Sequence, residues 1–383
     1  MLRFLTAGES HGPGLVTIVE GLPAGIEIRS DGMANQLRRR RSGFGRGRRM
    51  QIEQDELEIL AGVRHGRTLG SPLAVVIRNS EWAKWSEEMS PEPGRPKRVM
   101  ATPRPGHADL AGMLKYDTHD ARDILERASA RETAARTIVG YAASQLLLEI
   151  DVSVLSHVVA IGSLAVPDGT TPGPGDLDTI DESPVRVFAR EVERAMTEAI
   201  ELAKANRDTL GGVVEVLAFG VPAGLGSHVH WDRRLDTQLA GALMSIQGIK
   251  AVEMGDGFTS ASRPGSEAHD EIGFGGGEFV RGSDRAGGLE GGMSTGQTLR
   301  MRAAMKPIST LMRALQSVNV ATKEPAAAFR ERSDVCAVPA AGVVAEQVVA
   351  YVLAREVLRK FGGDTVADLI GAVSAYRNRL LAF

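Results

Sequence analysis

The sequence has only one cysteine, Cys336, among its 383 residues. A single thiol excludes a disulfide framework within the chain and any cysteine-rich metal site. It suits a reducing compartment, and we expect a cytoplasmic protein. No run approaches the roughly 18 apolar residues that a membrane span needs, so no membrane association is expected. Glu9, Ser10 and His11 interrupt the N-terminal segment before an apolar core could develop, which argues against a signal peptide.

Lysine and aromatic residues are also scarce. The 45 basic residues include eight lysines and therefore 37 arginines, and aromatic residues make up 4% of the chain. The net charge of −3 excludes a polycation built to coat nucleic acid. With 43% apolar and 24% charged residues, the chain is not disordered over most of its length. The arginine excess either reflects a GC-rich genome or supplies planar donors for carboxylate and phosphate groups, and the positions of the arginines have to decide.

Hydrophobic patterning predicts strands near 15–20, 51–63 and 72–78, and helices over 30–40 and 185–205. Ser129 and Glu132 have the spacing of a capping box, which predicts the start of a helix of about 20 residues. Five prolines fall within residues 79–107, which we expect to form a long loop.

Residues 213–225 repeat the pattern of residues 15–26. Both copies read as a strand followed by Gly-[Leu/Val]-Pro-Ala-Gly-[Ile/Leu], and a helix containing Gln-Leu follows each. The repeat predicts an internal duplication of about residues 13–150 and 211–378, unless a common turn has recurred by chance. A duplicated unit of strands and helices indicates an α+β fold in layers. We predict a single domain over residues 1–383.

Several short segments carry groups that suit an anionic ligand. Glycines flank Ser10 and His11 in residues 8–12, so a ligand can approach the backbone there. Residues 38–49 hold seven arginines, which could converge on one anion or form a solvated surface. Residues 273–296 contain ten glycines and are expected to form an extended loop whose N–H groups could cradle phosphate.

These residues alone indicate an enzyme for a multiply anionic substrate, with His11 and His107 available for proton transfer. Two alternatives remain open. Residues 38–49 could bind nucleic acid, and steep loss of affinity with salt would support that function. The glycine-rich loop at 273–296 could serve a phosphotransferase, which would need a nucleotide and magnesium.

Eight motifs, in order along essentially the whole chain, resemble the chorismate synthase family. They lie at residues 8–12, 38–49, 104–109, 128–133, 254–258, 287–292, 306–310 and 332–334. The resemblance implies a lyase that converts 5-enolpyruvylshikimate-3-phosphate to chorismate and phosphate, the last common step of aromatic biosynthesis. It further implies a β-α-β sandwich, a homotetramer and a requirement for reduced FMN. Because nothing resembles a dinucleotide fold, NADPH is expected only as an indirect reductant.

The resemblance also implies roles for particular residues and no metal site. His11 and His107 would set protonation states, with Ser10 and Asp334 supporting proton relay at the flavin. Positions that match flavin contacts are Arg127, Ala128, Ser129, Gln247, Gly248, Gly291, Lys306, Pro307, Ile308, Ser309, Thr310 and Arg332. Arg40 and Arg46 match NADP positions in the family, but we interpret both, together with Arg49 and Arg131, as ligands of the substrate's anionic groups. Gln247 and Gly248 depart from the Pro-Ala that many members have.

Overall fold

The computed structural model describes residues 1–47, 55–331 and 333–383. Most strands in these ranges belong to two antiparallel sheets. The first has the order β1 (Arg3–Ala7), β2 (Gly14–Glu20), β6 (Leu73–Arg78), β3 (Glu56–Ala61). The second has the order β10 (Ile249–Met254), β15 (Leu299–Met305), β9 (Gly212–Phe219), β7 (Ser153–Ile161), β8 (Leu164–Ala165). Short pairs are β4 (Val63–Arg64) with β5 (Arg67–Thr68), β11 (Ile272–Gly275) with β12 (Glu278–Arg281), β13 (Leu289–Glu290) with β14 (Met293–Ser294), and β16 (Gln316–Val318) with β17 (Pro325–Ala327).

Helices connect and cover these sheets. In the first half they are α1 (Ser30–Arg41), α3 (Trp82–Trp85), α4 (Asp109–Tyr116), α5 (Arg122–Ala128), the 3₁₀ turn η1 (Ala130–Glu132) and α6 (Thr133–Leu148). In the second half they are α7 (Leu177–Glu182), α8 (Arg190–Ala205), η2 (Trp231–Arg233), α9 (Leu235–Met244), α10 (Gly257–Ala261), α11 (Gly265–Ala268), α12 (Val338–Phe361) and α13 (Val366–Leu381). The α+β class predicted from the sequence is confirmed.

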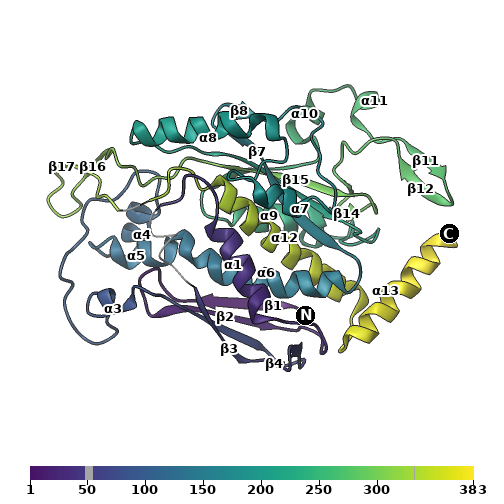
Figure 1. The fold of residues 1–383 in the computed structure, drawn as a ribbon, viewed down its shortest axis with the longest axis horizontal. Helices are drawn as coiled ribbons and strands as arrows, with labels where there is room; N and C mark the ends of the chain where they lie inside the picture. The colour runs from purple at the N-terminus through teal and green to yellow at the C-terminus, as the bar shows by residue number, and fades with distance from the viewer. Residues whose placement is uncertain (48–54, 332) are drawn as a thin grey trace.

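Helices α6 and α12 lie between the two sheets (Figure 1). α6 packs on β2 and α1, α12 packs on β7 and β9, and the two helices pack along each other. Gly140 of α6 permits this close approach, because a Cβ there would lie 2.2 Å from Cβ of Gln347 on α12. α12 is buried on nearly all sides, which explains its run of Ala and Val without an amphipathic pattern.

The two sheets share one pairing order. In the first, β1 pairs with β2, β2 with β6 and β6 with β3. In the second, β7 pairs with β9, β9 with β15 and β15 with β10. β2 and β9, the strands that contain the repeated residues, therefore occupy equivalent places in the two sheets.

The repeated turns also match in detail. Gly21 and Gly220 both have positive φ, 92° and 71°, at which a side chain is strained. Thr68 Oγ1 donates to the carbonyl of Pro23 at 2.6 Å, and Ser294 Oγ donates to the carbonyl of Pro222 at 2.6 Å. In each half, a side-chain hydroxyl therefore binds the proline carbonyl of the repeated turn at the same position.

Some predictions of local structure were wrong. The glycine-rich residues 273–296 are not one extended loop, because β11 and β12 pair there and so do β13 and β14. The reciprocal capping box is absent: Ser129 Oγ accepts from the Arg131 N–H, whereas the Glu132 carboxylate turns to Arg136. The helix expected over 185–205 begins only at Arg190. The strand expected over 51–63 is seen as β3, with residues 51–54 outside the described ranges.

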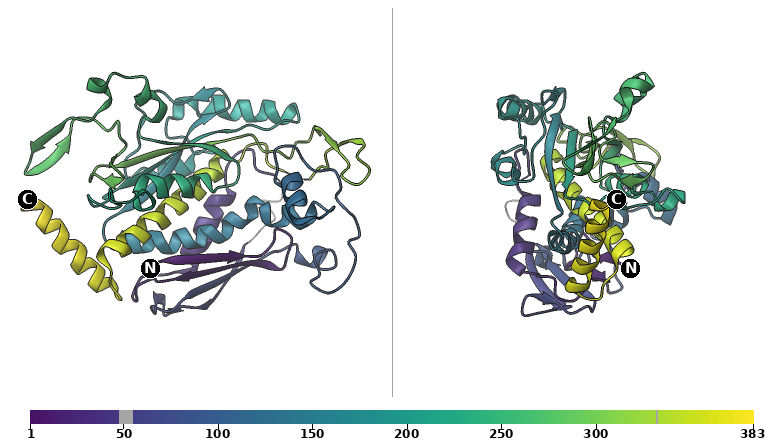
Figure 2. Two further views of the ribbon diagram at one scale, coloured as in Figure 1. Left: turned by 180° about the vertical axis from the view of Figure 1, so that it is seen from behind. Right: turned by 90° about the vertical axis from the view of Figure 1, so that its right-hand side faces the viewer.

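The β11–β12 hairpin and α13 extend away from the layered body (Figure 2). Both strands of the hairpin are almost wholly exposed, including Phe274 and Phe279. Within the described residues, no helix combines the length and apolar character required to cross a bilayer.

Candidate active site

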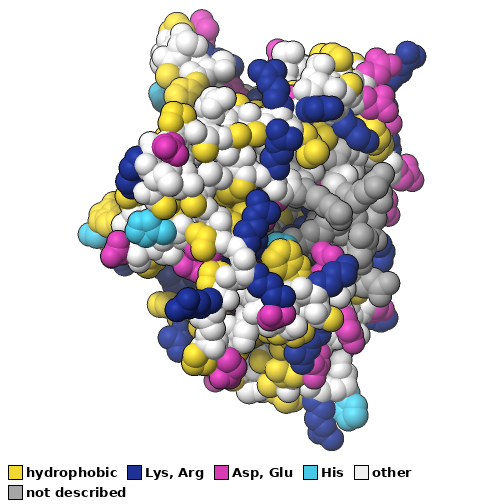
Figure 3. All heavy atoms as spheres, turned by 90° about the vertical axis from the view of Figure 1, so that its left-hand side faces the viewer, with side chains coloured by type: hydrophobic (Ala, Val, Ile, Leu, Met, Phe, Trp, Pro, Cys, Tyr) yellow, Lys and Arg dark blue, Asp and Glu magenta, His cyan; other side chains and the backbone are white. Residues whose placement is uncertain are grey.

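One cavity of about 430 Å³ lies where the loop after β1, the start of α6, the end of β15 and the start of α12 meet. Sixteen of the residues predicted for the site line it: Ser10, His11, Arg40, Arg46, His107, Ala128, Ser129, Arg131, Gln247, Gly248, Lys306, Pro307, Ile308, Ser309, Thr310 and Asp334. Figure 3 shows the face formed by this end of the molecule, with Lys and Arg side chains running down its middle.

The other four predicted residues are not placed in the cavity. Arg127 turns away from it and donates to the carbonyl oxygens of Thr6 and Gly8, both at 2.9 Å. Gly291 lies in the turn between β13 and β14, next to Gly292, whose carbonyl accepts from the N–H of Leu235 at the start of α9. The cavity is beyond the opposite end of that helix. Arg49 and Arg332 lie outside the described residues.

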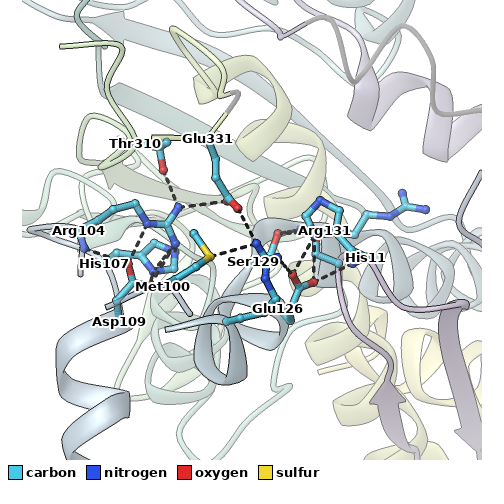
Figure 4. Close-up of polar contacts among 12 residues, drawn as sticks. His11, Met100, Arg104, His107, Asp109, Glu126, Ser129, Arg131, Thr310 and Glu331 are labelled. Carbon is cyan, nitrogen blue, oxygen red and sulfur yellow. Dashed lines mark hydrogen bonds and ion pairs between the residues drawn. The ribbon is translucent and has the colours of Figure 1, made fainter. Parts of the chain in front are cut away.

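His11 is held by a buried carboxylate. Its Nδ1 lies 2.9 Å from Oε1 of Glu126, and its backbone N–H donates to Oε2 of Glu126 at 2.8 Å (Figure 4). Since an ionised carboxylate can only accept, Nδ1 of His11 carries the hydrogen. The ring of Trp85 packs on the imidazole with a centroid separation of 4.1 Å. These contacts fix both the tautomer and the orientation of the imidazole.

Glu126 is stabilised in its ionised form. Burial raises the pKa of the Glu126 carboxyl, but hydrogen bonds from His11 and the charge of Arg122 outweigh it, so its pKa is lower than usual. Arg122 Nη1 donates to Glu126 Oε1 at 2.6 Å, one helical turn away on α5. The Arg122 guanidinium also stacks on Trp85 at 4.8 Å, which ties the aromatic ring to the same cluster.

His107 has an equivalent arrangement just before α4. Its Nδ1 contacts Oδ1 of Asp109, whose side chain is fully buried. Arg104 donates to the same carboxylate from Nε at 2.8 Å and from Nη2 at 3.1 Å, and from its backbone N–H at 3.0 Å. Burial raises the pKa of Asp109, but the bonds from His107 and Arg104 outweigh it and bring the pKa to about 2.

Two smaller pairs of side chains also line the cavity. Ser129 Oγ is 3.2 Å from Ser10 Oγ, which places two hydroxyls side by side at the cavity wall. Asp334 accepts from the Gly47 N–H at 2.7 Å and pairs with Arg46 Nη1 at 2.6 Å. The Asp334 carboxylate is therefore part of an ion pair facing the cavity.

Neighbouring protein groups fix the orientation of two cavity-lining arginines, Arg40 and Arg131. Arg40 donates to the neutral acceptors Thr133 Oγ1, at 2.9 Å, and the Ala130 carbonyl, at 3.1 Å. Arg131 donates to Asn79 Oδ1 at 2.9 Å and pairs with the buried carboxylate of Asp55. Both arginines are nearly fully buried, so their planar forks are oriented before any ligand arrives.

Lys306 and Gln247 also line the cavity. The Lys306 ammonium donates to the Gly106 carbonyl, and burial, with the nearby Lys250 charge, lowers its pKa below the usual range. Gln247 Nε2 donates to Glu132 at 3.3 Å, and its Oε1 is a buried acceptor with no partner among the described residues. The Gln247 amide therefore keeps one acceptor that a bound ligand could use.

Sequence reasoning missed the carboxylates and arginines that support the histidines. Glu126 and Arg122 were not expected in the site, although an i,i+4 pair of opposite charge on a short helix was visible in the sequence. Arg104 and Asp109 flank His107 within one motif but were not assigned roles. Glu331, also a cavity residue, had no sequence signal that we can identify.

The arrangement can hold an anion and move protons. Among the described residues, five cations line the cavity, namely Arg40, Arg46, Arg104, Arg131 and Lys306, together with the two carboxylates Glu331 and Asp334. Two imidazoles, each with a fixed ring, are available as general acids or bases. In the described part of the chain, no group of three or more His, Cys, Asp or Glu is placed to hold a metal ion.

Residues 2–358 match the chorismate synthase family. The chain belongs to this family. A chorismate synthase of Thermobifida fusca (strain YX) is 56% identical over 100% of both chains. One of Kocuria rhizophila is 57% identical over 98% of this chain and 92% of that protein. A crystal structure of a chorismate synthase superposes with a TM-score of 0.80 at 39% identity, covering 100% of this chain and 99% of that chain.

Membership of the chorismate synthase family confirms the prediction made from the eight motifs, and with it an enzyme of the carbon–oxygen lyase type. It favours that function over nucleic-acid binding by residues 38–49 and over a phosphotransferase built on the glycine-rich segment.

Proposed function

We propose that this protein eliminates phosphate from 5-enolpyruvylshikimate-3-phosphate to form chorismate. The observation that carries the proposal is one cavity in which His11 and His107, each paired with a buried carboxylate, lie among cationic side chains, five of them in the described part of the chain. The reaction breaks the C3–O bond to phosphate and removes a proton from C6, so it needs anion ligands and proton-transfer groups in one place.

The cations suit the charges of this substrate, which carries a phosphate and two carboxylates. Each charge-assisted hydrogen bond contributes about 1.5–3 kcal/mol, so several suffice for firm binding. Arg40 and Arg131 are the best candidates for the strongest contacts, because their guanidinium groups are already fixed by Thr133 and Asn79. Arg49, which we interpret from the sequence as a substrate-anion ligand, belongs to the same proposal.

The histidines would handle the protons. Glu126 keeps the hydrogen of His11 on Nδ1, so Nε2 is the nitrogen that exchanges a proton with a ligand. By the family resemblance, His11 acts near the departing phosphate and His107 near the flavin. Ser10 and Asp334 would support the relay, since Ser10 shares a hydroxyl contact with Ser129 and Asp334 is held by Arg46.

The residues present fit FMN. The cavity volume falls within the roughly 300–1,000 Å³ typical of ligand sites. Its wall combines apolar surface for a ring system, from Ile246, Met305 and Val344, with cations and hydroxyls for a phosphate. Flavin contacts are proposed for Ala128, Ser129, Gln247, Gly248, Arg332 and residues 306–310. Reduced FMN, when bound, supplies electron density that assists the departure of phosphate.

The first test is the cofactor requirement. We expect chorismate to form from the enolpyruvyl substrate only when FMN is present and reduced, under anaerobic conditions. NADPH should act only together with a separate flavin reductase. Product formation in air with oxidised FMN and no reductant would contradict the proposal.

A second test separates binding from chemistry. Replacing His11 or His107 by Ala should lower turnover by about 10²- to 10⁴-fold, as loss of a general acid or base does. Calorimetry should show that FMN and substrate still bind, since neither imidazole is among the proposed anion ligands. Near-normal turnover in both variants would show that the two histidines are structural.

We further infer a homotetramer of single-domain chains in the cytoplasm, each a β-α-β sandwich with the internal pseudo-duplication of residues 13–150 and 211–378. The exposed hairpin residues Ile272, Phe274 and Phe279 support contacts between chains, because such apolar patches are usually covered. Gly291 and Arg127, which lie outside the cavity of their own chain, would need another copy or a rearrangement to reach a flavin. Light scattering coupled to gel filtration tests the stoichiometry, and a monomer would contradict it.

A further inference from the structure

The carboxylate of Glu331 lies between two arginines that support different histidines. Its Oε2 is 3.7 Å from Nη1 of Arg104, and its Oε1 is 3.6 Å from Nη2 of Arg122 (Figure 4). Glu331 follows β17, whereas Arg104 precedes α4 and Arg122 begins α5. The Glu331 side chain, from a third segment of the chain, therefore contacts both the arginine beside His107 and the arginine beside His11.

The two parts have the same order of groups. On one side Arg122 binds Glu126, and Glu126 binds Nδ1 of His11. On the other side Arg104 binds Asp109, which in turn contacts Nδ1 of His107. Each imidazole is thus oriented by a buried carboxylate, and each carboxylate is held by an arginine.

We propose that Glu331 is a positioning residue, which acts through Arg104 and Arg122 to fix the positions of the His11 and His107 rings relative to each other. The proposal rests on the function proposed above. Two guanidinium groups that approach the same point repel each other, and a carboxylate between them offsets that repulsion. The Glu331 side chain is 26% exposed, so solvent screens this interaction only in part.

The same geometry predicts which kinetic constant depends on Glu331. The residue lines the cavity as an anion, so neutralising it does not remove a ligand for an anionic substrate. Neutralising Glu331 would instead allow the Arg104 and Arg122 side chains to shift. The imidazoles of His107 and His11, which these arginines position, would then shift as well. A displacement of about 1 Å in a reacting group can cost about 10²-fold in rate. The loss should therefore appear in kcat and not in KM.

The kinetic experiment compares Glu331→Gln, which keeps the shape but not the charge, with Glu331→Asp, which keeps the charge on a shorter side chain. Glu324→Gln is the matched control, because Glu324 is exposed on the neighbouring β16–β17 turn. With reduced FMN we expect Glu331→Gln to lower kcat by about tenfold to a hundredfold and to change KM by less than about twofold. Glu331→Asp should recover part of kcat, and the control should behave as wild type. Wild-type kcat in Glu331→Gln, or a loss confined to KM, would overturn the proposal.

A spectroscopic experiment tests the bridge without turnover. The imidazole signals of His11 are followed by NMR in the full-length protein without substrate. His107→Ala should move those signals in the wild-type background and leave them unmoved in the Glu331→Gln background, because the link through Arg104, Glu331 and Arg122 is then broken. An equal effect in both backgrounds would refute the bridge. If the wild type forms no chorismate, the proposed function fails, while this measurement still decides the role of Glu331.

Discussion

Replacing Asp109 by Asn should destabilise the protein strongly. The Asp109 carboxylate is fully buried and accepts hydrogen bonds from the backbone N–H, Nε and Nη2 of Arg104 and from Nδ1 of His107. An Asn amide offers one acceptor oxygen where two are needed and turns its own N–H groups toward these donors. The variant would also remove the nearest counter-charge of the buried Arg104 guanidinium and leave, among the described residues, only the Glu331 carboxylate, 3.7 Å away.

The size of the effect follows from two estimates. The pKa of Asp109 falls from 3.8 to about 2 in the folded protein. At about 1.4 kcal/mol per pKa unit, this favours the ionised form by about 2 kcal/mol. Removing one partner of a buried ion pair typically costs about 3–5 kcal/mol. We therefore expect Asp109→Asn to lower the free energy of unfolding by about 2–5 kcal/mol at pH 7.

The pH dependence has a definite sign. Since the folded pKa lies below the unfolded value, the ionised Asp109 stabilises the protein fully above pH 3.8, and this contribution is lost as the pH falls through about 2. The difference between wild type and variant should be constant from pH 7 to pH 5, with roughly half of the ionisation part lost near pH 3.

Urea unfolding followed by tryptophan fluorescence measures this difference at each pH. Asp168→Asn is the control, because Asp168 is exposed and its loss should change stability by no more than about 0.5 kcal/mol. A difference for Asp109→Asn as small as that of the control, or one that does not shrink between pH 5 and pH 3, would refute the reasoning.

Three further outcomes follow from the structure. Arg40→Ala should weaken substrate binding by about tenfold or more with little change in kcat, measured by calorimetry and steady-state kinetics, because one charge-assisted bond is lost. Cys336, buried and with its pKa raised by burial to about 11, should react with a thiol reagent only when the protein unfolds. Asp284→Asn should raise the unfolding temperature at pH 8 but not at pH 3, because burial raises the pKa of Asp284 from 3.8 to about 6 in the folded protein and the resulting loss of stability develops between these two values; an equal change at both pH values would count against this.

Local patterns in the sequence were enough to predict the family and several of the helices and strands. The repeat at residues 15–26 and 213–225 predicted two equivalent strands, and both lie at equivalent places in their sheets as β2 and β9. Glycine positions, periodicity and motif order depend on neighbouring residues along the chain, so they can be read without coordinates. The same patterns could not show that residues 273–296 pair into hairpins, because pairing depends on contacts between strands rather than on glycine content.

The partners of the site residues were decided only by the tertiary structure. His11 meets Glu126 across 115 positions of sequence, and no local signal connects the two. The arginines of α1 show the physical reason most directly, since successive residues on a helix point about 100° apart. Arg39 therefore reaches the buried Glu346 on α12, Arg40 enters the cavity beside Thr133, and Arg41 pairs with Asp55. The sequence determined that these arginines lie together on a helix, but only the packing of other elements around that helix determined which of them faces the cavity.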